Sequence, residues 1–102
     1  MVYHSGTSRV NRTLVMIVRR NDRPLNRYGI SVSKKIGNSV VRHRVKRVIR
    51  EVIRLNNDCI IQGYDIVIVG RSNSASGDYQ KIESAILHLL NLHHLMSDNN
   101  RI

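Results

Sequence analysis

The sequence has few of the residue types that cross-link or stack within a small domain. Cys59 is the only cysteine among 102 residues, so an internal disulfide and a Cys-x-x-Cys metal motif are excluded. Phe and Trp are absent, so the core must consist mainly of Val, Ile and Leu. No apolar run reaches the roughly 18 residues of a membrane-spanning helix, and the N-terminus lacks the continuous apolar segment of a signal peptide. These absences favour a reducing, cytoplasmic setting.

Acidic residues are also scarce. Seven Asp and Glu stand against 17 Lys and Arg, which gives a net charge of +10 and a pI near 10.9. A small domain this basic is suited to nucleic acid or another anionic surface. The length predicts a single domain over residues 1–102, the charge makes RNA binding its expected role, and the polar tail at 97–102 is expected to be disordered.

The order of apolar patterns predicts an α+β fold. Alternating and β-branched residues indicate strands at 12–20, 28–33 and 64–70, and helical periodicity indicates helices at about 39–55 and 78–96. The short turn containing Pro24 favours an antiparallel hairpin between the first two strands. We therefore expect a small two-layer sandwich, with one mostly antiparallel sheet and helices on one face. The other sheet face would form an open groove.

The first helix combines a core face with a basic face. Residues 31–54 carry eight of the 17 Lys and Arg. At about 100° per residue, one arc of the helix holds Arg42, His43, Lys46, Arg47, Arg50 and Arg54. The opposite arc holds Val41, Val45, Val48, Ile49 and Val52, while Arg44 lies apart and Ile53 lies near the boundary. Like charges four residues apart on a helix repel each other. Binding of phosphates would neutralise these cations and so explain why the basic arc is tolerated.

The start of this helix adds a second anion-binding feature. Asn38 is the expected N-cap, which leaves the first helical amides available to an anion. Lys34 and Lys35 lie just before it. Contact with RNA or DNA phosphates is the leading interpretation. The alternatives are an amphipathic helix with a solvated face, and a membrane-surface helix, although the core requires the apolar face.

The segment SVSKKIGNSVVRHRVKRVIREVIR closely resembles the signature of the bacterial ribonuclease P protein subunit. The family pattern is approximately S-K-K-x-G-N-A-V-x-R-N-R-x-K-R-x-x-R. Asn11–Arg12 with the preceding Gly-Thr-Ser, the strand YDIVIV and the helix after Tyr79 resemble further family regions. The resemblance covers about residues 3–95.

The resemblance implies a role in tRNA processing. Family members bind ribonuclease P RNA, and the ribonucleoprotein acts as an endonuclease that hydrolyses one phosphodiester bond to remove the 5′ leader of precursor tRNA. Magnesium held by the RNA performs the chemistry, so the protein is expected to supply no catalytic residue and to bind no cofactor or metal itself. The implied partners are ribonuclease P RNA and precursor tRNA, with no membrane or DNA. The implied fold is an α+β sandwich with a left-handed βαβ crossover.

The resemblance also implies site residues. The positions matching the RNA-contacting signature are Lys34, Lys35, Asn38, Arg42, Arg44, Lys46, Arg47 and Arg50, with His43 between the two arginines. Tyr3 and Ile17 match aromatic positions of the cleft that holds the leader. Three departures from the family pattern stand out: His43 replaces the usual Asn, Ile17 replaces an aromatic residue, and the N-terminal helix that the resemblance implies is expected to be missing, through truncation or as a feature of this member.

The sequence gives little support for a catalytic site formed by residues of this chain alone. The spacing of His88, His93 and His94 gives no pair four residues apart, so solvated or capping roles are expected instead of a zinc site. No convincing carboxylate pair for metal-assisted hydrolysis stands out. A ribonuclease P subunit is therefore the leading hypothesis. A structural, ribosomal-type RNA-binding protein and a protein-only nuclease are the rivals.

Overall fold

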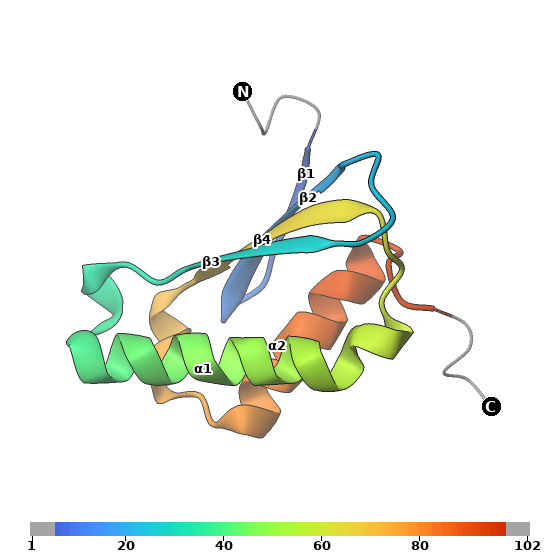
Figure 1. Cartoon of the computed structure of the whole chain (residues 1–102). Helices are drawn as coiled ribbons and strands as arrows, with labels where there is room; N and C mark the ends of the chain where they lie inside the picture. The colour runs from blue at the N-terminus through green and yellow to red at the C-terminus, as the bar shows by residue number, and fades with distance from the viewer. Residues whose placement is uncertain (1–5, 98–102) are drawn as a thin grey trace.

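The computed structural model describes residues 6–97, which form one four-stranded sheet with two helices against one of its faces (Figure 1). The strands are β1 (Thr7–Val10), β2 (Leu14–Arg20), β3 (Arg27–Ser31) and β4 (Tyr64–Gly70). The helices are α1 (Ser39–Asn56) and α2 (Tyr79–Leu92), with short 3-10 turns η1 (Lys34–Ile36), η2 (Asn57–Cys59) and η3 (Ser72–Ser76). The predicted α+β sandwich is confirmed. β1 lies in a polar segment, where no alternation of apolar and polar residues predicted a strand.

The strand order is β1-β2-β4-β3. β2 pairs antiparallel with both β1 and β4, whereas β3 runs parallel to β4. The chain passes from β3 through α1 to β4, so these elements form a βαβ crossover in a mostly antiparallel sheet. The predicted hairpin between the strands before and after Pro24 is wrong, because β4 lies between β2 and β3.

The central position of β4 has a physical reason. Ile66 and Ile68 are fully buried, and β-branched residues on both faces suit a strand that is hydrogen-bonded along both edges. The segment between β2 and β3 is hydrogen-bonded to the residues at the beginning of β4. The Asn21 amide donates to Gly63 O at 3.0 Å, and Asn26 Oδ1 accepts from the Tyr64 amide at 2.8 Å.

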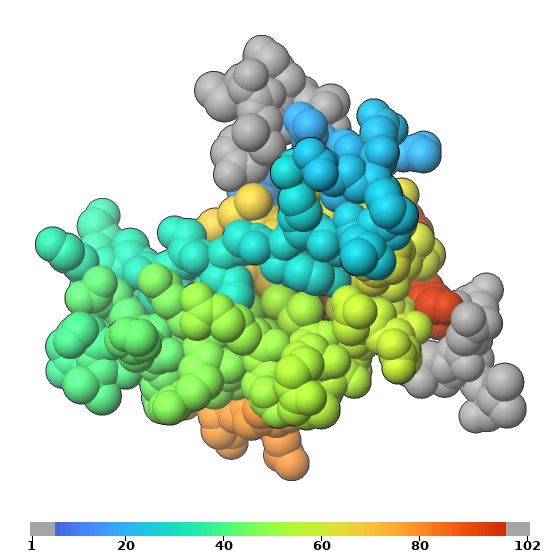
Figure 2. Space-filling view, in the orientation of Figure 1, coloured from blue at the N-terminus to red at the C-terminus, as the bar shows by residue number. Residues whose placement is uncertain are grey.

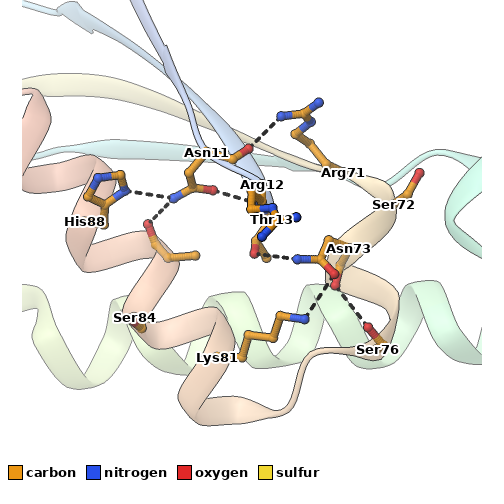
Figure 3. A pocket seen from close by; sticks show the side chains of 11 residues that line it. Asn11, Arg12, Thr13, Arg71, Ser72, Asn73, Ser76, Lys81, Ser84 and His88 are labelled. Atoms are coloured by element: carbon orange, nitrogen blue, oxygen red, sulfur yellow. Dashed lines mark hydrogen bonds between the residues drawn. The ribbon is translucent and has the colours of Figure 1, made fainter.

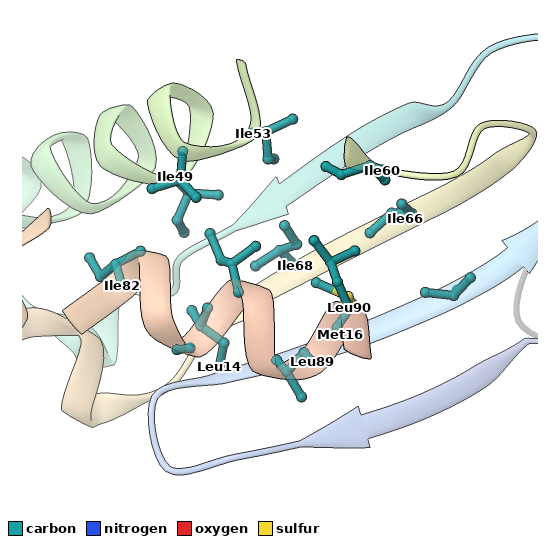
Figure 4. Packing of buried hydrophobic residues seen from close by; sticks show 14 of the residues in the cluster. Leu14, Met16, Ile49, Ile53, Ile60, Ile66, Ile68, Ile82, Leu89 and Leu90 are labelled. Atoms are coloured by element: carbon teal, nitrogen blue, oxygen red, sulfur yellow. The ribbon is translucent and has the colours of Figure 1, made fainter. Parts of the chain in front are cut away.

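The core lies between the sheet and the two helices (Figure 4). Alternate residues of β2 and β4 point toward it, as Met16 and Ile68 do, and α1 contributes Val45, Ile49 and Val52. Ile53, expected near the boundary, is only 8% exposed. The buried face of α1 is therefore rotated slightly toward the basic arc.

The helix ends agree with local capping chemistry. Asn38 Oδ1 accepts from the Val41 amide at 3.0 Å, as predicted, and Asp78 Oδ1 accepts from the Lys81 amide at 2.9 Å. α2 ends at Leu92, four residues before the predicted end. His94 has a φ of 60°, which turns the chain away from the helix axis.

The residues after α2 return to the body of the domain. Ser97, expected to begin a disordered tail, donates its amide to Cys59 O at 2.7 Å. The rest of that tail, 98–102, lies outside the described residues. Within residues 6–97, neither helix combines the length and apolarity needed to cross a membrane.

Candidate nucleic-acid interface

The basic arc of α1 forms one continuous side of the helix, which crosses the face shown in Figure 2. His43, Arg47 and Arg50 are exposed, and Lys46 is half-buried. Among residues 6–97, the only cation of α1 in an ion pair is Arg54, whose Nη2 lies 2.5 Å from Glu51 Oε2. The charges of Lys46, Arg47 and Arg50 therefore remain available to an anionic partner.

The segment before α1 holds two further lysines close to the helix start. Lys34 and Lys35 are exposed on η1, which contacts α1. This close approach requires Gly37, because a Cβ there would lie 2.9 Å from Val41 Cγ1. Arg42 Nε donates to Gly37 O at 3.2 Å and secures the same junction. Two lysines, a helix N-terminus and the basic arc thus form one cationic surface, which we call the α1 surface.

Arg44 differs from the other arginines of α1. Its guanidinium donates to the Gly77 carbonyl through Nη1 at 2.8 Å and to the Ala75 carbonyl through Nη2. Ala75 belongs to η3 and Gly77 follows it, so Arg44 joins α1 to η3 and to the residue after it. Its position apart from the basic arc was visible in the sequence, but the carbonyl partners were not. Contact between Arg44 and RNA stays a prediction.

The sheet face opposite the helices holds the predicted cleft residue Ile17. Ile17 is half-buried and pairs in register with Ser8 on β1 and Val67 on β4. Val15 and Val69, also half-buried, form the neighbouring pair on this face. The other predicted cleft residue, Tyr3, lies outside the described residues.

An arginine–aspartate cluster lies at one end of this open face. Arg27 binds Asp65 with both ends of its fork, with Nε–Oδ1 at 2.8 Å and Nη2–Oδ2 at 2.7 Å. Asn21 Nδ2 also donates to Asp65 Oδ1 at 3.1 Å, and Arg19 is the register partner of Asp65 on β2. This cluster was not predicted from the sequence, although strand alternation places Arg19 on the same face as Ile17.

Comparison with known proteins identifies the family. The model of the ribonuclease P family matches residues 1–93. The chain belongs to the ribonuclease P family. A relative from Lachnoclostridium phytofermentans, named ribonuclease P protein component, is 52% identical over 98 residues, which cover 96% of this chain and 84% of the relative. Another from Clostridium botulinum strain Loch Maree, with the same name, is 51% identical and covers 87% and 81%.

Solved structures of ribonuclease P proteins have the same fold as this chain. The ribonuclease P protein of Staphylococcus aureus superposes with a TM-score of 0.85 at 32% identity, covering 94% of this chain and 88% of the other. That of Thermotoga maritima gives a TM-score of 0.82 at 30% identity, with coverages of 89% and 86%. This chain is therefore a protein subunit of ribonuclease P, an endoribonuclease ribonucleoprotein. The ribosomal-type alternative is not supported.

In this ribonuclease P subunit, the Asp65 cluster makes folding stability depend on pH. The Arg27 hydrogen bonds, aided by Asn21 and the charge of Arg19, lower the pKa of Asp65 from 3.8 to about 2. Because the folded-state pKa lies below the unfolded value, the stabilisation is complete above about pH 4 and is lost as the pH falls toward 2. We expect the unfolding temperature of the wild type to fall more steeply across this window than that of Asp65→Asn.

The matched control for that measurement is Asp58→Asn, because Asp58 is exposed and has no ion-pair partner within residues 6–97. Its pH profile should follow that of the wild type. Parallel profiles for the wild type and Asp65→Asn between pH 4 and 2 would show that the Arg27 pair does not stabilise the fold.

His88 and His93 of this family member make contacts within the fold. His88 Nδ1 lies 3.2 Å from Asn11 Nδ2, and His93 Nε2 lies 3.0 Å from Met16 O. Burial lowers the pKa of His93. No group of three or more His, Cys, Asp or Glu within residues 6–97 has the arrangement of a metal site.

Proposed function

We propose that this subunit binds the ribonuclease P RNA through the α1 surface and holds the 5′ leader of precursor tRNA on the open sheet face, in the bacterial cytoplasm. The observation that carries the proposal is the division of α1 into two faces. One packs Val45, Ile49 and Val52 into the core, and the other presents Lys46, Arg47 and Arg50 without acidic partners among the described residues. Such cations contact phosphates and position RNA without reading its sequence.

The proposed leader site combines an apolar floor with cations at its edge. Ile17 and Val67 are neighbours in register at its centre, and Arg19 and Arg27 lie at one end. Single-stranded RNA is commonly bound by stacking on a platform while cations track the backbone. Ile17 can contact a base but cannot stack as an aromatic ring does, so it should hold a base more weakly than an aromatic residue would.

We assign the hydrolysis of the phosphodiester bond to the RNA and the Mg²⁺ that it holds. In this scheme the residues of this chain bind and orient the two RNA molecules, and none of them is assigned to the metal. The contribution of the protein to the reaction is then electrostatic: the α1 surface offsets phosphate repulsion where catalytic RNA and substrate meet.

The test is cleavage of 5′-labelled precursor tRNA by a bacterial ribonuclease P RNA at low Mg²⁺, with and without the protein. We expect faster cleavage with the protein, at one site, leaving the mature 5′ end. A second substrate without a leader should bind the holoenzyme more weakly than the precursor. Binding without stimulation would indicate a purely structural RNA-binding protein. Equal affinity for an unrelated RNA of the same length would contradict the subunit role.

A further inference from the structure

A groove of about 1100 Å³ opens beside α2, in a part of the molecule that the proposed function does not use (Figure 3). Its walls come from the turn between β1 and β2, from η3 with the preceding Arg71, and from α2. No residue of α1 lines it. Arg44 holds η3 from the α1 side, so η3 separates the groove from the α1 surface.

The groove is cationic. Arg12, Arg71 and Lys81 line it, together with His88, and no Asp or Glu is among its lining residues. The other lining side chains that can form hydrogen bonds are Asn, Ser and Thr. Because three cationic residues line one hollow without a carboxylate, an anion in the groove would be attracted by all three.

Two of the three cations of the groove are held by neutral oxygen atoms. Arg71 Nη1 donates to the Asn11 carbonyl at 2.7 Å, and Lys81 Nζ donates to Asn73 Oδ1 at 3.1 Å. A guanidinium has five N–H donors and an ammonium has three, so each keeps donors for a ligand. A charged acceptor binds such donors more strongly than a neutral one. The side chains are thus positioned without being neutralised.

The frame of the groove is preformed. Asn11 Oδ1 accepts from the amides of Thr13 and Leu14 at 3.0 and 2.8 Å, which fixes the turn between β1 and β2. Asn11 Nδ2 donates to Ala85 O at 3.1 Å and ties this turn to α2. The Arg71 amide donates to Thr13 O at 2.9 Å and ties it to η3. The three backbone segments that carry the cations are therefore joined to one another, which lowers the entropy lost on binding.

We propose that this groove binds the phosphate backbone of an RNA strand, as a second RNA contact distinct from the α1 surface. Pockets for small organic ligands are mostly apolar, whereas this lining is polar and cationic. The groove is larger than one phosphate group requires, and Asn, Ser and Thr are typical partners of phosphate and sugar oxygens. The proposal rests on the proposed function, because it extends RNA binding to another side of the same subunit.

The test is the double variant Arg12→Gln/Lys81→Gln of the full chain. Both side chains are exposed, so the unfolding temperature should not change. Two lost phosphate contacts should weaken RNA binding about 20-fold at 0.15 M salt and reduce the slope of log K against log salt by about 1.5. The control Arg20→Gln/Arg23→Gln removes the same charge from exposed positions outside the groove and should leave the slope unchanged.

Two binding measurements distinguish the source of the phosphates. Weaker binding of ribonuclease P RNA by the free variant would place that RNA in the groove. Weaker binding of precursor tRNA by the assembled holoenzyme alone would place the substrate there. If neither changes while substitutions on α1 still weaken RNA binding, the groove proposal is overturned and the proposed function stands. If the wild-type protein binds neither RNA, both are overturned.

Discussion

Replacing Lys46, Arg47 and Arg50 together with Gln is expected to weaken binding of ribonuclease P RNA about 100-fold at 0.15 M salt. Each phosphate contact adds about 0.7 to 0.9 to the slope of log K against log salt, because binding releases condensed counterions. Loss of three contacts should therefore flatten the slope by about 2 to 3. Near 1 M salt the variant and the wild type should bind almost equally.

The fold of this variant should be unaffected. None of the three side chains forms an ion pair within residues 6–97, and Gln keeps a flexible apolar stem and a good helix propensity. Affinity measured from 0.05 to about 1 M salt, with an unfolding curve for each protein, checks both expectations. The variant Arg20→Gln/Arg23→Gln is a control for nonspecific loss of charge. A salt slope equal to that of the wild type would remove the α1 surface from the RNA interface.

Arg44→Ala is expected to lower the free energy of unfolding by about 1 to 3 kcal/mol, because hydrogen bonds from a charged donor typically contribute in this range. The substitution leaves the Ala75 and Gly77 carbonyls without the guanidinium that joins them to α1. Chemical denaturation measures the loss. Arg47→Ala, at an exposed position on the same helix, should change stability by less than about 0.5 kcal/mol.

This difference between the two arginines affects how RNA-binding variants are interpreted. A combined Arg42→Ala/Arg44→Ala variant, which the sequence suggests as a test of RNA contact, would remove a structural contact as well. Arg44→Lys retains the charge but not the fork geometry, so it should recover little of the stability while preserving long-range attraction for RNA. Wild-type stability of Arg44→Ala would show that the carbonyl contacts do not contribute.

Local patterns determined much of the fold in advance. The N-cap Asn38, the two faces of α1 and the buried strand at 64–70 were predictable, because capping and periodicity depend on neighbours within a few residues. The pairing of β2 with β3 was predicted wrongly. A short connection indicates that two strands run in opposite directions, but it does not exclude a third strand between them.

The candidate sites also divide into those that local sequence patterns predict and those that only the tertiary structure reveals. The cationic character of the α1 surface follows from residues three and four apart on one helix. The Arg27–Asp65 pair and the groove beside α2 join residues that are distant in the sequence, such as Asn11 and Ala85. No local pattern encodes these contacts.

The sequence by itself determined that this chain is a basic α+β protein whose first long helix has one apolar face and one cationic face, because charge and amphipathicity are properties of contiguous residues. Only the tertiary structure decided that β4 occupies the centre of the sheet, that Arg44 supports the fold, and that Arg12, Arg71 and Lys81 face one groove. The physical reason is that these features depend on which distant segments pack together, and that choice is made by burial of the whole core.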